Sequence, residues 1–82
     1  MNNKPITRGP SVDKSKSIFA QRMREKRRAK GWDQWEFAEM LGVSVESIGN
    51  WETDQRKPRI DVLVKMAKLL EVSTDWLLGL EG

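Results

Sequence analysis

The stretch FAEMLGVSVESIGNW, residues 37–51, predicts two short helices separated by a sharp turn at Gly42. Glycine adopts the left-handed backbone conformation that ends a helix without a steric penalty. Ser44 is a favoured residue type for the N-cap of the second helix. Apolar residues recur at helical spacing on both sides of the turn and predict a shared core: Phe37, Ala38, Leu41, Val43, Ile48 and Trp51.

This arrangement of helix, three-residue turn and helix is the helix-turn-helix motif. The two helices of such a motif cross steeply, and the small side chain of Ala38 suits the crossing point. The second helix also carries a row of small or polar residues that the Ile48 and Trp51 stripe does not use. We expect this row to face solvent: Ser44, Val45, Glu46, Ser47, Gly49 and Asn50.

The flanking sequence predicts three further helices and no strand. A first helix begins at the N-cap Ser17 and ends at Gly31, with Ile18, Phe19 and Met23 on its apolar face. Asp33 and Glu36 have the spacing of a capping box at the start of the first motif helix. A fourth helix spans about 60–70, and Ser73 or Thr74 caps a short fifth helix. The chain is therefore predicted to be all-α, a compact bundle of five helices.

Residues 1–16 differ from the rest, since they are polar and show no periodicity. We interpret them as a flexible basic N-terminal tail, with the domain at 17–82. Such a tail either follows a groove of a binding partner or is disordered, and disorder is favoured.

Composition excludes several classes of function. The 82 residues contain neither histidine nor cysteine, so the commonest general base, disulfides and thiolate metal sites are absent. We expect no enzyme, no cofactor, no metal and no small-molecule substrate. No apolar run is long enough for a signal peptide or a membrane span, and a cytoplasmic location is expected.

The charge is unevenly distributed along the chain, although its net value is only +3. Residues 18–31 are rich in arginine and lysine, whereas residues 32–52 carry five acids and no base. A second basic cluster lies at Arg56, Lys57 and Arg59. This pattern is consistent both with solvated helix faces and with a basic footprint divided between two segments.

From Ser17 to Leu78 the chain resembles the Cro/cI-type helix-turn-helix domain of phage repressors and XRE-type bacterial regulators. The segments that carry the resemblance are MREKRRAKGWDQ, FAEMLGVS, SIGNWE, RKPR and VSTDWLLG. The resemblance implies a lambda-repressor-like fold that binds double-stranded operator DNA, usually as a homodimer. It implies a nucleoid-associated regulator of transcription, most simply a repressor.

The resemblance also implies roles for residues of the motif. The second motif helix, about 44–52, enters the major groove and meets base edges. Asn50 suits a bidentate contact to adenine, and Glu46 suits an acceptor role toward cytosine. The residues expected at the bases are Ser44, Val45, Glu46, Ser47, Gly49 and Asn50.

The expected phosphate contacts are Gln34, Arg27, Arg56, Lys57 and Arg59. By resemblance, Arg27 and Glu52 form an ion pair that joins the first helix to the end of the second motif helix. Phosphate contacts set affinity and register but carry no base code.

Three leucines near the C-terminal end are the candidate dimer surface: Leu77, Leu78 and Leu80. Trp35 has two open interpretations, since it either lies along the sugar-phosphate backbone or packs on a neighbouring subunit. Trp35 and the apolar C-terminal segment also give slight support to an alternative function, an antitoxin-like or anti-repressor protein-interaction module on the same fold. Arg59 and Glu71 depart from the resembling pattern, which has Ser or Thr and Gly at these positions.

Overall fold

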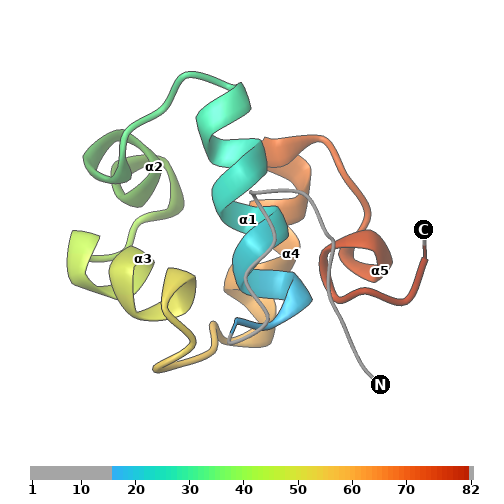
Figure 1. The fold of residues 1–82 in the computed structure, drawn as a ribbon. Helices are drawn as coiled ribbons and strands as arrows, with labels where there is room; N and C mark the ends of the chain where they lie inside the picture. Colours follow the sequence, from blue (N-terminus) through green and yellow to red (C-terminus); the bar gives the residue numbers. More distant parts are fainter. Residues whose placement is uncertain (1–15, 82) are drawn as a thin grey trace.

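The computed structural model describes residues 16–81, and the tail predicted at 1–16 lies outside them except for Lys16. This part of the chain contains five helices and no strand. The helices are α1 (Ile18–Ala29), α2 (Gln34–Leu41), α3 (Val45–Glu52), α4 (Ile60–Leu70) and α5 (Thr74–Leu77). In Figure 1, α1 lies in the middle of the molecule, with the α2–α3 pair on one side and α5 on the other.

Side-chain caps begin four of the five helices. The hydroxyls of Ser17, Ser44 and Ser73 each accept a backbone N–H one turn into α1, α3 and α5. Asp33 and Glu36 form the predicted capping box at the start of α2, with N–H to carboxylate distances of 2.8 and 2.9 Å. These bonds satisfy backbone donors that have no partner within the helix. The predicted helix starts are therefore confirmed.

The turn between α2 and α3 has the predicted geometry. Gly42 is left-handed, with φ 74° and ψ 31°. The N–H of Val43 donates to the carbonyl of Ala38 at 3.0 Å, which closes the end of α2. Ser44 then caps α3 directly, and the small side chain of Ala38 is buried in the core.

One apolar core joins all five helices. Its fully buried large side chains are Phe37, Met23, Ile48, Met66, Leu70 and Leu77. Trp32 is half-buried and packs against this core, where its ring stacks on Phe37 with centroids 5.9 Å apart. Burial of each such side chain stabilises the fold by roughly 1.5–3 kcal/mol relative to exposure.

The predicted apolar face of α1 is wrong at its first residue. Ile18 is 48% exposed, whereas Phe19, Ala20 and Met23 are buried. The buried stripe follows the four-residue spacing from Phe19 to Met23 and Arg27, and Ile18 lies beside that stripe.

The two departures at the ends of α4 have different outcomes. Arg59 occupies the N-cap position without a side-chain hydrogen bond. Glu71 adopts the left-handed conformation with φ 61°, as glycine would, and its carboxylate pairs with Lys30 at 2.9 Å. The helix ends are therefore regular although the residue types are unusual.

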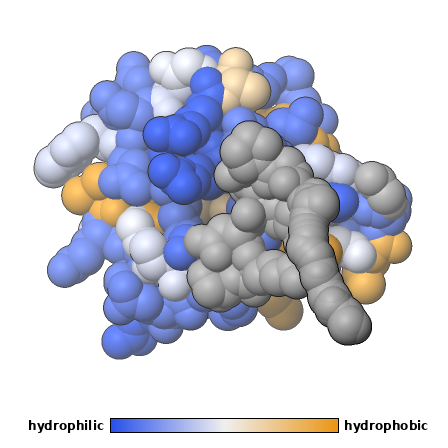
Figure 2. All heavy atoms as spheres, in the orientation of Figure 1, coloured by the Kyte–Doolittle hydropathy of each residue, from blue (hydrophilic) through white to orange (hydrophobic). Residues whose placement is uncertain are grey.

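The surface in Figure 2 is mostly hydrophilic, with smaller apolar areas toward the sides of the view. Within residues 16–81, no helix combines the length and apolar character needed to cross a bilayer. The same residues contain no group of three or more acidic side chains placed to hold a metal ion.

Candidate nucleic-acid interface

The edge of α3 predicted to read bases does not lie in the core. Ser44 and Glu46 are exposed, and Ser47, Gly49 and Asn50 are half-buried. The opposite side of α3 carries Ile48, Trp51 and Glu52, which are all buried. The helix is therefore anchored along one side and accessible along the other.

Val45 differs from the other members of this edge. Its side chain is half-buried and packs against the core. Only part of its surface is available for a thymine methyl group, so Val45 serves the scaffold as well as the edge.

The first turn of α3 is held by its two serines. The hydroxyls of Ser44 and Ser47 lie 2.9 Å apart, and the Ser47 N–H donates to the Ser44 hydroxyl at 3.2 Å. These bonds fix the side chains where the helix begins, and they leave lone pairs on exposed oxygens for a ligand.

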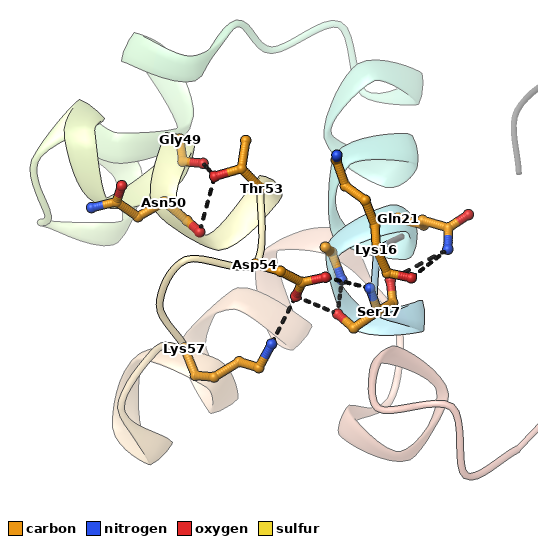
Figure 3. Close-up of polar contacts among 9 residues, drawn as sticks. Lys16, Ser17, Gln21, Gly49, Asn50, Thr53, Asp54 and Lys57 are labelled. Carbon is orange, nitrogen blue, oxygen red and sulfur yellow. Dashed lines mark hydrogen bonds and ion pairs between the residues drawn. The ribbon is translucent and has the colours of Figure 1, made fainter. Parts of the chain in front are cut away.

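Asn50 keeps its side-chain amide free among the described residues, and Figure 3 shows the amide pointing away from α1. Its backbone carbonyl accepts the N–H groups of Gln55 and Arg56 at 2.8 and 3.3 Å. The residue thus anchors the following loop through its backbone and leaves the amide for recognition. A primary amide offers the donor and acceptor that adenine requires.

Gly49 has no packing reason to be glycine. A Cβ built on it meets no heavy atom within 4 Å. Glycine inside a helix costs about 0.5–1 kcal/mol relative to alanine. The position is therefore compatible with close approach by a ligand, because no residue within 16–81 fills the space.

A buried ion pair supports α3 from behind. The Arg27 Nε donates to Glu52 Oε2 at 2.7 Å, and the two residues are 7% and 5% exposed. Arg27 Nη1 also donates to the carbonyl of Trp32 at 2.7 Å. The expected Arg27–Glu52 pair is thus present. We leave Arg27 out of the proposed phosphate contacts because its guanidinium is buried and already bonded.

Gln34 lies beside this pair at the first position of α2. Its amide nitrogen donates to Glu52 Oε1 at 3.0 Å, which places the side chain between α2 and α3. Gln34 is half-buried and lines the hollow between α1 and α3.

A hollow between α1 and α3 collects further cations that sequence reasoning left unassigned. Arg24 and Arg28 lie one helical turn apart on α1, and both line this hollow. Other residues that line it are Lys16, Arg27, Gln34, Gly49, Glu52 and Thr53. The four-residue spacing of Arg24 and Arg28 was the available signal, but only the packing of α1 on α3 shows which side they face.

Arg22 lies away from this hollow, although it is also on α1. Its guanidinium donates to the carbonyls of Trp76 and Glu81 and lies 4.4 Å from the Trp76 ring centroid. Arg22 therefore holds the segment after α5 and is not part of the candidate interface.

The loop after α3 carries exposed cations. Arg56 is exposed, and so is Arg59, whose guanidinium lies 3.5 Å from Asp61. Lys57 Nζ lies 2.7 Å from Asp54 Oδ1. Arg56 has no ion pair within residues 16–81, and the contact of Arg59 is longer than that of Lys57. Arg56 and Arg59 are therefore the stronger candidates for phosphate contacts.

Asp54 is a structural residue that sequence reasoning missed. The hydrogen bond from Lys57, followed by those from the hydroxyl and N–H of Ser17, lowers its pKa from 3.8 to about 2. Its φ of 64° is left-handed, a conformation that Asp and Asn tolerate better than most residues. No motif spacing predicts a contact between Ser17 and Asp54.

The predicted dimer surface needs a correction at Leu77, which is fully buried. A single helical turn that packs on α1 and α4 directs one side chain into the core, and in α5 that side chain is Leu77. Leu78 and Leu80 remain exposed, at 47% and 73%. Leu78 also lines an apolar hollow with Ile18 and Leu63.

Trp35 is 71% exposed on α2. The hollow beside it includes the carboxylates of Asp33, Glu36 and Glu39. These acids repel phosphate, which disfavours the interpretation that Trp35 lies along the DNA backbone.

A sequence model of the helix-turn-helix family matches residues 23–77. The chain belongs to the XRE-type helix-turn-helix family. This helix-turn-helix chain is 42% identical over 61 residues to the HTH-type transcriptional regulator ImmR of Bacillus subtilis. The aligned region covers 74% of the chain and 48% of that protein. It is 38% identical over 63 residues to YobD of the same organism, an uncharacterized HTH-type transcriptional regulator, with 77% and 56% covered. The chain spans about half the length of the curated relatives it matches.

Solved structures support the same assignment. The P22 c2 repressor in complex with a synthetic operator superposes with a TM-score of 0.71 at 32% identity, covering 73% of this helix-turn-helix chain and 91% of that one. SinR, a regulator of biofilm formation solved in complex with DNA, gives a TM-score of 0.68 at 33% identity, with 73% and 97% covered. The lambda-repressor-like fold predicted from the sequence is therefore confirmed.

Proposed function

We propose that this chain is a sequence-specific, double-stranded DNA-binding regulator of transcription, a repressor of the phage or prophage type. The observation that carries the proposal is the accessible edge of α3 on a scaffold anchored by Gly42 and the buried Arg27–Glu52 pair. In this proposal α3 enters the major groove and the protein acts by occupying its operator. Such a function requires no cofactor and no catalytic residue.

Base readout is assigned to the α3 edge. Asn50 supplies a side-chain amide that has no partner among residues 16–81, and Glu46 supplies an exposed carboxylate in the first turn. Each good bidentate contact contributes about 1–3 kcal/mol of discrimination against the wrong base. The full set at the groove is Ser44, Val45, Glu46, Ser47, Gly49 and Asn50.

Phosphate contacts are assigned on both sides of that edge. Gln34, Arg24 and Arg28 line the hollow between α1 and α3, while Arg56 and Arg59 lie in the loop that follows α3. Two separated cationic sites fit the two strands that border a groove. Lys57 joins them only if DNA displaces its contact with Asp54.

A second copy completes the proposed operator complex. Leu78 and Leu80 are exposed at the α5 end, away from the α3 edge, and we assign the dimer surface to them. Two α3 helices related by a two-fold axis then read half-sites about 34–36 Å apart. The related protein P22 c2 was solved with an operator, which supports the choice of ligand. The proposed location is the cytoplasm, on the nucleoid.

Selection from a random duplex pool, followed by titration, tests the proposal. The selected palindrome and its scrambled counterpart are compared by fluorescence anisotropy across a salt series. Specific affinity is expected to exceed non-specific affinity by about 10³-fold or more. Equal affinity for both duplexes at every salt concentration would rule out base readout. A stoichiometric protein partner combined with no DNA retention would instead support the protein-interaction module.

A further inference from the structure

The start of α1 is tied to the loop after α3 by a single carboxylate. Asp54 accepts the backbone N–H and the hydroxyl of Ser17, the latter at 2.7 Å. It also accepts the ammonium of Lys57 at 2.7 Å. Figure 3 shows the three donors converging on the carboxylate from two segments of the chain. We call these three residues, Ser17, Asp54 and Lys57, the loop brace.

The hydroxyl of Ser17 has two functions in the loop brace. It accepts the N–H of Ala20 at 3.1 Å, which caps α1, and it donates its own proton to Asp54. The side chain of Ser17 therefore fixes Asp54 relative to α1, which is packed in the core. Charge-assisted hydrogen bonds of this kind are stronger than neutral ones.

The other end of the loop is bonded to α3. The hydroxyl of Thr53 donates to the carbonyl of Gly49 at 2.8 Å, and the N–H of Gln55 donates to the carbonyl of Asn50 at 2.8 Å. Residues 53–55 are thus held by α3 on one side and by α1 on the other. Arg56 follows directly and is exposed.

We propose that Asp54 is a positioning residue of the DNA interface, which holds the loop at 53–59 so that Arg56 and Arg59 meet phosphates without prior ordering. This inference rests on the proposed DNA-binding function. Ordering a loop on binding reduces affinity, and a loop held in advance avoids that loss. Phosphate contacts carry no base code, so Asp54 acts equally on specific and non-specific binding.

The negative charge of Asp54 gives the opposite expectation if it acts only through electrostatics. A carboxylate near DNA repels phosphate, and its removal would then strengthen binding and release Lys57. In the loop brace, however, the charge is compensated by the ammonium at 2.7 Å. The two explanations therefore predict effects of opposite sign.

Asp54→Asn is the principal variant, because asparagine also tolerates a left-handed backbone and removes only the charge and one of the two acceptor oxygens. We expect it to weaken binding to the selected palindrome and to the scrambled duplex alike. The expected loss of affinity is roughly tenfold. This factor corresponds to the conformational entropy that is lost when the backbone of one additional residue becomes ordered on binding. The slope of log affinity against log salt should flatten by about 0.9 for each phosphate that the loop no longer neutralises.

Two further variants separate positioning from repulsion. Asp54→Asn combined with Lys57→Met should bind as weakly as Asp54→Asn alone, because the loop brace is already broken. Ser17→Ala removes one donor from the carboxylate and should weaken binding less, in the same direction. Lys65→Met on the exposed side of α4 is the matched control for removal of a lysine, and the salt slope should not change.

Urea denaturation and circular dichroism confirm that each variant is folded at the temperature of the titration. The inference is overturned if Asp54→Asn binds DNA as tightly as the original chain, or more tightly. It is also overturned if specific binding alone weakens, since that result indicates a disturbed α3. Failure of the original chain to bind any duplex would reject the proposed function itself, and this outcome is distinguishable from the others.

Discussion

Two turns in this protein share a sequence pattern and a backbone geometry but differ at one residue. LGVS at 41–44 joins α2 to α3, and LEVS at 70–73 joins α4 to α5. Gly42 and Glu71 are both left-handed, with φ 74° and 61°. In each turn the N–H of the following valine donates to an alanine carbonyl of the preceding helix at 3.0 Å. The shared pattern thus ends a helix and starts the next whether or not glycine is present.

The helices next to these two turns differ in the ion pair at their C-terminal end. The first turn leads to α3, and the second turn ends α4. α1 contacts the end of α3 through the buried Arg27–Glu52 pair, and it contacts the end of α4 through the exposed Lys30–Glu71 pair. A buried charge without a partner strongly destabilises the fold, whereas an exposed ion pair contributes little to the free energy of unfolding. The end of α3, the helix that presents the proposed recognition edge, is therefore held by a stronger ion pair than the end of α4.

The largest effect is expected at the buried pair. Glu52→Gln leaves the guanidinium of Arg27 without a compensating charge, and it should reduce the free energy of unfolding by up to about 3–5 kcal/mol. Urea denaturation measures this change. Glu71→Gln at the exposed pair is the matched control and should alter stability much less. Similar reductions for both variants would contradict the comparison.

The next effect is expected at the two left-handed positions. Gly42→Ala places a Cβ on a left-handed residue and should destabilise the fold by about 1–2 kcal/mol. Glu71→Gly removes the same strain and should raise the melting temperature, because its exposed ion pair contributes little. If both substitutions shift the melting temperature in the same direction, the two turns are not equivalent.

A smaller effect, with opposite signs for stability and binding, is expected inside α3. Gly49→Ala should stabilise the fold by about 0.5–1 kcal/mol, since the added methyl group meets no heavy atom within 4 Å in the part of the chain that the structure describes. Affinity for the selected duplex should fall, because the methyl group occupies space at the proposed DNA contact. Thermal denaturation and anisotropy, measured on one preparation, check both signs. Unchanged affinity would remove Gly49 from the interface.

The smallest effect concerns acid and Asp54, which is left-handed like Glu71. The pKa of Asp54 is about 2 in the folded protein, against an ordinary value of 3.8. A carboxyl group with a depressed pKa stabilises the fold above its ordinary pKa, and this contribution disappears as the pH falls from about 4 toward 2. Asp54→Asn should therefore make stability less dependent on pH over that range. Urea denaturation at about pH 5, 4, 3 and 2, which spans this titration, measures the difference between the two chains.

Most of the fold could be predicted because its signals are local. The caps at Ser17, Asp33 and Ser44 and the bend at Gly42 depend on residues within one helical turn of one another. Leu77 was misplaced because a four-residue helix has too few side chains to define an apolar face. The role of Asp54 could not be predicted because its partner at Ser17 is 37 residues away in the chain.

By itself, the amino-acid sequence determined the number of helices, their boundaries and the row of residues along α3, since propensity, capping and periodicity act over a few residues. Only the tertiary structure decided which charges are buried, which are paired and which remain accessible. Arg22, Arg24 and Arg27 lie on one helix and look alike in the sequence. In the structure, Arg22 holds the segment after α5, Arg24 lines the hollow beside α3, and Arg27 neutralises Glu52. The physical reason is that the surroundings of a side chain depend on neighbours brought close by packing, and one helix can face three different neighbours.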